Sequence, residues 1–255
     1  MSQVEYGPLA QYYELINESC VPYDAQAALV CALLEESHPI GERRRVLDVA
    51  CGPGLLSRRL QARHVEVVGI DLAEALLAQA VARRRGRFVR ADMRWQPFSA
   101  GSFDVACCLL HSANYMTRDE DLALVFSGIA DALRPGGMAA VDFIAYEPRS
   151  EWKAQWSETI RAADVTIVTE HDQTPDWTTM VAIDRHTYTV REAERTWTAS
   201  GEDHLRITSA GEMRRFAEKA GLEPITVCAK YALHAGPGSD GGVLVARKAG
   251  GRWAR

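Results

Sequence analysis

Apolar and polar positions follow two different patterns along this chain, and the main change lies near residue 146. Up to residue 145, short apolar runs occupy 46–50, 65–70, 87–91, 103–110 and 138–145. The segments between them carry apolar residues every three or four positions, which is typical of helices that bury one face. Strands that alternate with helices predict right-handed crossovers and a mostly parallel sheet.

Two patterns of Ser or Thr followed three residues later by Glu predict helix starts. Thr117–Glu120 and Ser209–Glu212 both have the spacing of a capping box. The helix that Thr117 begins is expected to end at Arg134–Gly137, because proline removes a backbone donor and glycine permits positive φ. Other predicted helices cover much of the first forty residues, 55–62 and 73–85.

Beyond about residue 146 the pattern alternates with a period of two. Residues 164–207 are rich in Thr, Val, Ile, Tyr and Trp, which predicts antiparallel strands, and strands at 225–229 and 243–246 close the chain. We therefore expect an α/β fold: a Rossmann-like, mostly parallel seven-stranded sheet with helices on both faces, plus an antiparallel β-rich insertion after the fifth strand. The single expected domain, 1–255, comprises a helical cap (1–40), a core (41–145), the insertion (146–208) and the completion of the sheet (209–255).

Composition narrows the class of protein. Among 255 residues, 29 Lys and Arg stand against 34 Asp and Glu, a net charge of −5, which argues against a nucleic-acid partner. No apolar run reaches the roughly 18 residues that span a bilayer, and residues 1–10 do not resemble a secretory signal. The six cysteines form no C-x-x-C pair and are expected to be mostly buried thiols, which favours the cytoplasm.

The most informative stretch is Val46–Gly54, which reads as a strand, a glycine turn and a helix start. Gly52 and Gly54 let the backbone approach a ligand closely, but such a turn serves several nucleotide cofactors and is sometimes purely structural. Asp48 would repel a pyrophosphate, and Ser57 stands where the dinucleotide fingerprint has Gly or Ala, so a dehydrogenase-like site is the weaker alternative. Asp71 ends the second strand, where an acid can accept both hydroxyls of a ribose.

Asp92 and Met93 follow the third strand, where they can meet an adenine edge. A ligand with a ribose, an adenine and a positive end fits these residues, and S-adenosylmethionine has all three. The chain resembles the class I S-adenosylmethionine-dependent methyltransferases in a set of motifs that occur in family order: Leu47–Gly54, Gly69–Leu72, Ala91–Met93, Phe103–Val105 and Leu133–Gly137.

The resemblance implies a set of cofactor contacts. Asp48 and Gly52 would face the methionine end, Asp71 the ribose, and Asp92 with Met93 the adenine. The remaining expected cofactor-binding residues are Tyr13, Ala50, Gly54, Leu72, Leu109 and His111. S-adenosylhomocysteine would be the co-product, and the core at 41–145 would bind the cofactor.

Three further segments resemble small-molecule N-methyltransferases, namely deoxyamino-sugar enzymes of antibiotic pathways and glycine N-methyltransferases. These are Tyr6–Tyr13, His111–Met116 and the insertion, which ends in His204–Thr208 and would cover the substrate. Tyr6, Tyr115 and His204 are the candidate catalytic residues. Tyr115 stands where the sugar enzymes often have histidine, Tyr6 can equally anchor the N-terminal helix, and His204 can equally be structural.

The expected function is methyl transfer to a small-molecule acceptor, an amine nitrogen of a natural product or sugar, by in-line displacement with catalysis through positioning. O-methylation of a small molecule and non-catalytic cofactor binding are the alternatives. No nucleic-acid or membrane partner and no metal site are expected, and the insertion is a candidate surface for self-association. The other histidines, His64, His171, His186 and His234, are expected to be structural or exposed.

Overall fold

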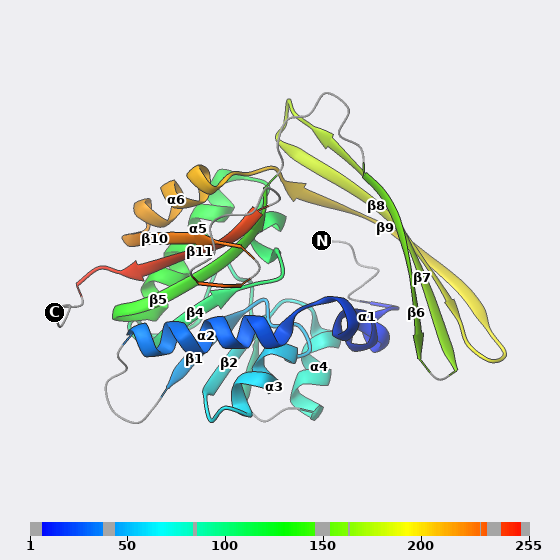
Figure 1. Ribbon diagram of the computed structural model, residues 1–255, viewed down its shortest axis with the longest axis horizontal. Helices are drawn as coiled ribbons and strands as arrows, with labels where there is room; N and C mark the ends of the chain where they lie inside the picture. Colours follow the sequence, from blue (N-terminus) through cyan, green and yellow to red (C-terminus); the bar gives the residue numbers. More distant parts are fainter. Residues whose placement is uncertain are drawn as a thin grey trace.

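The computed structural model describes residues 7–37, 44–83, 86–145, 154–162, 164–229, 231–233 and 241–250. Figure 1 shows the arrangement of the elements. The helices are η1 (Ala10–Tyr12), α1 (Tyr13–Cys20), α2 (Tyr23–Ser37), α3 (Leu55–Gln61), α4 (Glu74–Arg83), η2 (Ser112–Tyr115), α5 (Asp119–Ala132) and α6 (Ala210–Lys219). The strands are β1 (Arg45–Val49), β2 (Glu66–Asp71), β3 (Arg87–Arg90), β4 (Phe103–Cys108), β5 (Leu133–Ile144), β6 (Ala154–Ala162), β7 (Val165–Asp176), β8 (Val181–Arg191), β9 (Thr196–Arg206), β10 (Leu222–Cys228) and β11 (Gly241–Lys248).

Seven strands form one sheet in the order β10-β11-β5-β4-β1-β2-β3. β1 pairs in parallel with both β2 and β4, and β4 pairs in parallel with β5. β11 is antiparallel to both of its neighbours, β5 and β10. The chain therefore leaves β1 toward one side of the sheet and later returns to β4 on the other side. The expected mostly parallel seven-stranded sheet is confirmed.

Helices cover both faces of this sheet because successive strand residues point to opposite sides. On one face, Val46 and Val105 pack with apolar residues of α2 and α3, among them the fully buried Leu33. On the other face, Leu47 and Ala106 pack with residues of α5 and α6. Burial of one leucine side chain such as Leu33 contributes about 2 kcal/mol to folding. The two apolar clusters fix the ends of the strands in space.

The second sheet contains β6, β7, β8 and β9 in chain order, all antiparallel, and it stands beside the larger sheet in Figure 1. At one end its inner face packs on η1, where Tyr188 and Val190 meet Leu9. At the other end Leu205 packs with Tyr115 of η2. The antiparallel β-rich insertion expected after the fifth strand is thus confirmed, and its inner face is anchored at both ends.

The two capping boxes have different outcomes. At α6 the Glu212 N–H donates to Ser209 Oγ at 3.2 Å, as expected. At α5 the prediction from Thr117 is wrong, because Arg118 is the N-cap and no side chain caps the helix there. Three acidic residues in the first turn of α5 favour the helix start instead, through the helix dipole.

Two of the compositional expectations can be compared with the structure. All six cysteines are free thiols, and four of them are buried: Cys51, Cys107, Cys108 and Cys228. Among the described residues, no helix combines the length and the apolarity that a membrane crossing needs.

Candidate active site

A cavity of about 460 Å³ opens at the carboxyl ends of β1, β2, β3 and β4. Ligands of open α/β folds bind where the strand order reverses, which here is between β1 and β4. The volume is in the range of pockets that hold a nucleotide-sized molecule. The residues that line it are Tyr13, Ile16, Asn17, Ala50, Gly52, Ile70, Asp71, Leu72, Leu76, Ala91, Asp92, Met93, Arg94, Leu110, Ser112, Tyr115, Met116 and Asp121.

The glycine turn after β1 forms one wall. Ala50, Gly52 and Gly54 all have positive φ, at 59°, 53° and 76°. Glycine adopts this conformation without the steric cost that a side chain brings, which explains the two glycines. Ala50 and Gly52 line the cavity, whereas Gly54 is the N-cap of α3 and is not among the lining residues. Gly54 thus shapes the turn, and Gly52 faces the cavity.

Asp71, at the end of β2, is the best-placed acid of the cavity. Its Oδ2 accepts the Gly52 N–H at 2.7 Å and its Oδ1 accepts the Ala73 N–H at 2.8 Å. Burial raises the pKa of Asp71 above its ordinary value. Each carboxylate oxygen accepts one backbone bond and has a further lone pair. The neighbouring Leu72 lines the cavity and is 44% exposed, as expected for a residue that covers a ligand.

Asp48 lies deeper, in the wall of a small adjoining cavity that Tyr13, Ala50 and Gly52 also line. Ser57 Oγ donates to Asp48 Oδ2 at 2.9 Å. Burial, with a smaller contribution from the Asp71 charge, raises the pKa of Asp48 to about 7. Ser57, which departs from the dinucleotide fingerprint, therefore serves as the partner of a buried acid.

Asp92 lines the cavity as expected, but its carboxylate is bound by a neighbour. Arg94 donates from Nε at 3.0 Å and from a terminal nitrogen at 2.6 Å, and this pairing lowers the pKa of Asp92. The other terminal nitrogen of Arg94 donates to Asp121 at 2.9 Å. Sequence reasoning missed both Arg94 and Asp121, although an arginine two residues after an acid was a readable signal. Met93 is buried and lines the same wall.

The segment after β4 is held in an unusual conformation by Asp142 of β5. Leu110 and His111 both have positive φ, and their backbone N–H groups donate to Asp142 at 2.8 and 2.6 Å. Tyr231 also donates to Asp142, at 2.5 Å. Asp142 is 2% exposed, and its burial raises its pKa. An acid inside an otherwise apolar predicted strand was the signal for this residue, which sequence reasoning missed.

This turn shifts the expected contacts of the segment by one residue. Leu110 and Ser112 line the cavity. Leu109 packs instead with residues of α2 and α3 and reaches only the small adjoining cavity. His111 is not among the described lining residues of either cavity, and its visible role is the backbone bond to Asp142.

Tyr115 links the cavity to the four-stranded sheet. It lines the cavity, and its hydroxyl donates to Oδ2 of the buried Asp203 of β9 at 3.1 Å. The preceding Asn114 donates from its amide to the carbonyl oxygens of Ile144 and Arg206, at 3.1 and 2.8 Å. The Ile144 N–H donates back to Asn114 Oδ1 at 3.1 Å. One short helix therefore fixes the cavity wall to both sheets.

Comparison with known protein families shows which kind of domain contains this cavity. Residues 46–137 match the family model described as "Methyltransferase domain". This part of the chain is a methyltransferase domain. The family resemblance expected from the motifs of the sequence is confirmed, and the matched segment contains the glycine turn, Asp71, Asp92 and Tyr115.

Curated relatives of the methyltransferase domain cover about half of this chain, and the chain spans about half the length of the relatives it matches. A dTDP-4-amino-2,3,4,6-tetradeoxy-D-glucose N,N-dimethyltransferase of Saccharopolyspora spinosa is 35% identical over 46% of this chain and 47% of that protein. A ubiquinone biosynthesis O-methyltransferase of Marinobacter nauticus is 36% identical over 42% of this chain and 47% of that protein.

Solved structures extend the likeness in fold to almost the whole chain. CalS10 of Micromonospora echinaspora, described as an amino pentose methyltransferase with S-adenosylmethionine bound, superposes with a TM-score of 0.77. The comparison covers 93% of this chain and 96% of that one at 22% identity. The fold shared with such methyltransferases includes the region beyond the methyltransferase domain.

The three candidate catalytic residues have different outcomes. Tyr6 lies outside the described residues. His204 is on β9 with its side chain 55% exposed, and its Nε2 lies 2.8 Å from Glu202. Within the methyltransferase domain, Tyr115 is the candidate that lines the cavity.

Proposed function

We propose that this protein transfers a methyl group from S-adenosylmethionine to an amine nitrogen of a small-molecule acceptor, such as an amino sugar of a natural-product pathway. The observation that carries the proposal is Asp71, whose carboxylate lies at the end of β2 beside the glycine turn and borders the cavity. An acid at this position suits a ribose because it can accept both hydroxyl groups.

The residues around the cavity fit the parts of this cofactor. Asp71 would accept the ribose hydroxyls with the lone pairs that its two backbone bonds leave available. Ala91 and Met93 offer apolar atoms to the adenine ring. Tyr13, Gly52 and the deeper Asp48 would meet the methionine end, where the buried carboxylate favours a cationic group. When bound, S-adenosylmethionine supplies an electrophilic methyl group on a sulfonium.

The polar groups of the cavity favour an amine acceptor. Among the described lining residues no histidine occurs, and Arg94 donates to the carboxylates of both Asp92 and Asp121. An amine needs only to be uncharged to attack, whereas a hydroxyl or phenol has greater need of a base. Tyr115, bonded to Asp203, would orient the acceptor, so that catalysis rests on positioning. The sugar N,N-dimethyltransferase relative supports this acceptor class.

Release of S-adenosylhomocysteine, measured against amino sugars, amino acids and phenols, tests the proposal. We expect turnover with at least one amine and calorimetric binding of S-adenosylmethionine that Asp71→Ala weakens at least a hundredfold. Glu66→Ala, on the exposed start of the same strand, is the matched control and should bind as the parent does. Absence of cofactor binding, or binding unchanged by Asp71→Ala, would overturn the proposal.

O-methylation is the second candidate, because a relative of similar identity is named as an O-methyltransferase. The same panel separates the two reactions. Turnover confined to phenols or hydroxyl compounds would replace the amine proposal while leaving the cofactor site intact.

We also propose that residues 1–255 act as one unit in the cytoplasm. The cap at 1–40 and the insertion at 146–208 would enclose the small-molecule acceptor, and 41–145 with 209–255 would provide the sheet. Participation in an antibiotic pathway and self-association through the insertion remain predictions, which a substrate screen and the mass in solution would test.

A further inference from the structure

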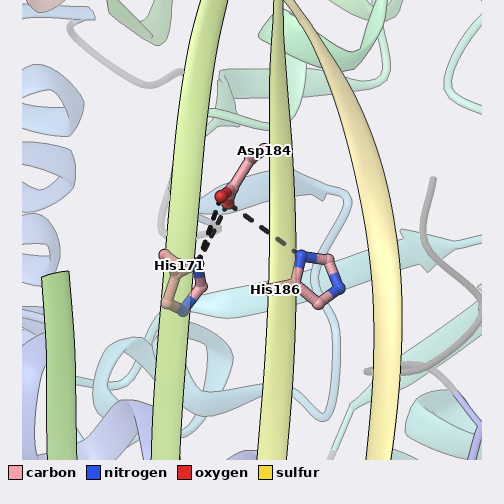
Figure 2. Close-up of side chains that lie close together, drawn as sticks. All are labelled: His171, Asp184 and His186. Atoms are coloured by element: carbon pink, nitrogen blue, oxygen red, sulfur yellow. Dashed lines mark hydrogen bonds and ion pairs between the residues drawn. The ribbon is translucent and has the colours of Figure 1, made fainter. Parts of the chain in front are cut away.

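Three potential metal ligands converge on the inner face of the four-stranded sheet, outside the cavity described above. His171 of β7 and Asp184 and His186 of β8 each present one ligand atom, and these atoms all lie within 4.8 Å of one another. His171 Nδ1 is 3.1 Å from Asp184 Oδ2, and His186 Nδ1 is 4.0 Å from the same oxygen. Figure 2 shows both imidazoles turned toward the carboxylate.

Strand register brings these residues together. His171 lies directly opposite His186 in the antiparallel pair of β7 and β8. Asp184 precedes His186 by two residues and therefore shares its face of the sheet. Trp156 of β6, opposite His171, stacks on that imidazole with ring centres 4.5 Å apart and planes within 4° of parallel. The position of the His171 ring is thereby fixed before any ligand arrives.

Burial and charge both favour a cation at this cluster. The side chains of His171, Asp184 and His186 are 14%, 12% and 1% exposed. Asp184 lies directly opposite Asp203 on β9, so two buried acids are neighbours on one face. Like charges in opposite positions of a sheet destabilise it, and a bound cation would relieve the repulsion.

The donor set selects the class of cation. Two imidazole nitrogens and one carboxylate oxygen suit Zn²⁺, Co²⁺ and Ni²⁺ rather than Mg²⁺ or Ca²⁺. Ligand bonds of about 2.0–2.2 Å in a tetrahedral site put ligand atoms about 3.3–3.6 Å apart. The two distances to Asp184, 3.1 and 4.0 Å, lie on either side of that spacing. Three protein ligands leave a further coordination position for water or a small molecule.

We propose that His171, Asp184 and His186 bind one divalent transition-metal ion of the zinc class. The ion would cross-link β7 to β8 in the sheet that carries Asp203 and, through it, contacts Tyr115 of the cavity. The proposal departs from two expectations from the sequence: that His171 and His186 are structural or exposed, and that the chain has no metal site. It does not depend on the proposed methyl transfer.

Titration of the full chain with Co²⁺, after treatment with a chelator and removal of any affinity tag, tests the site. We expect one equivalent of Co²⁺ to produce the visible absorption of a low-coordinate ion and Zn²⁺ to displace it. Quenching of Trp156 fluorescence by bound Co²⁺ should accompany this, and Trp156→Phe should remove that part of the quenching while binding remains. Zn²⁺ should raise the unfolding temperature of the parent chain.

His171→Ala, His186→Ala and the near-isosteric Asp184→Asn should each weaken Co²⁺ binding at least about tenfold. His204→Ala is the matched control, because this exposed imidazole on the same sheet also lies beside a carboxylate, that of Glu202. It should bind Co²⁺ as the parent does. Circular dichroism verifies that each variant is folded, and Asp184→Asn keeps the test valid if an alanine variant does not fold.

Three results would overturn the proposal: no saturable binding by the parent chain, equal binding by the parent and all three cluster variants, or the same loss in His204→Ala. The proposal would also be contradicted if the cluster variants unfolded at a lower temperature than the parent and Zn²⁺ did not raise the unfolding temperature of the parent. The cluster would then be a hydrogen-bonded pair of His171 and Asp184 beside a second imidazole.

Discussion

Two regions of this protein contain buried carboxylates, and the groups that bind these carboxylates differ between the regions. At the carboxyl edge of the seven-stranded sheet, Asp71 and Asp142 each accept backbone N–H groups from the segments that follow the strands. In the four-stranded sheet, Asp184 and Asp203 meet side chains instead, an imidazole and a phenol.

This difference decides whether a single substitution can remove the hydrogen-bond partner of a buried acid. A backbone donor is present whatever the side chain, so Asp71 and Asp142 depend mainly on the conformation of the loops. A side-chain partner depends on residue identity and strand register, so the acids of the small sheet can lose theirs through one substitution. We infer that single substitutions disturb the buried polar contacts of the small sheet more readily than those of Asp71 and Asp142 in the large sheet.

The largest effect is expected from Asp142→Ala. It would leave the N–H groups of Leu110 and His111 and the hydroxyl of Tyr231 without their acceptor. Each unmet buried donor costs about 1–3 kcal/mol, so we expect a net loss of about 3 kcal/mol, measured by urea unfolding.

Asp104→Ala is the matched control for Asp142→Ala. Asp104 is also a buried acid, but it lies at the start of β4, where it accepts from Arg45 N–H and Arg134 Nε. Both variants should be destabilised, and only Asp142→Ala should also weaken cofactor binding. Equal cofactor affinity in the two variants would show that Asp142 does not shape the cavity.

Asp48→Asn should stabilise the ligand-free protein at high pH. Burial raises the pKa of Asp48 from 3.8 to about 7, so the folded state binds its proton more tightly than the unfolded state. Stability from this group is therefore present below about pH 4 and is lost as the pH rises toward 7. At pH 8 we expect Asp48→Asn to raise the free energy of unfolding by about 2 kcal/mol. Each kcal/mol corresponds to about 2–4 °C in unfolding temperature for a chain of this size.

The pH series contains its own control, because the gain from Asp48→Asn should vanish near pH 4, where the parent carboxyl is protonated. Cofactor affinity should fall at least about tenfold in the same variant, since the buried charge would be absent. The raised pKa of Asp48 would be contradicted if the difference in unfolding temperature between Asp48→Asn and the parent were the same at pH 4 and pH 8.

Arg94→Ala should have an intermediate effect, mainly on cofactor binding. Removing the guanidinium leaves Asp92 and Asp121 without their shared cation at the cavity wall. The pair is partly exposed, so we expect a stability change of only about 1 kcal/mol and a five- to tenfold weaker affinity for the cofactor, measured by calorimetry. Arg90→Ala, which breaks the exposed ion pair with Glu74, should leave the affinity unchanged.

Tyr115→Phe is expected to give the smallest measurable change. It removes one hydrogen bond to Asp203, worth about 1 kcal/mol. If catalysis rests on positioning, kcat/KM for the acceptor should fall less than about tenfold, with cofactor affinity unchanged. His204→Ala should not alter either quantity. A hundredfold loss in Tyr115→Phe would instead show that the hydroxyl contributes far more than one ordinary hydrogen bond to turnover.

Much of the large sheet and its site was predictable because the signals are local. The glycine turn, Asp71 and Asp92 each lie directly after an apolar run, and parallel strands bring such positions to one edge. Leu109 was placed one residue too early because the positive φ of Leu110 and His111 depends on Asp142, more than thirty residues away.

In the small sheet the proposed metal-binding cluster could not be predicted from local sequence signals. Its strands were predictable from their alternation, but the meeting of His171 with His186 depends on the register between β7 and β8, which the pattern alone does not fix. The capping box at Thr117 failed for a related reason, because Arg118 became the N-cap and a capping pattern does not say which nearby residue begins the helix.

The position of Asn114 has a consequence for how this architecture can vary. Its amide binds Ile144, where the chain leaves the large sheet, and Arg206, where the chain returns, and Ala145 bridges to Thr208 beside them. The insertion is therefore a cassette whose two ends are joined at one point. If the insertion encloses the acceptor as proposed, exchanging residues 145–208 for the insertion of another protein of this fold should change the acceptor and leave the cofactor site intact.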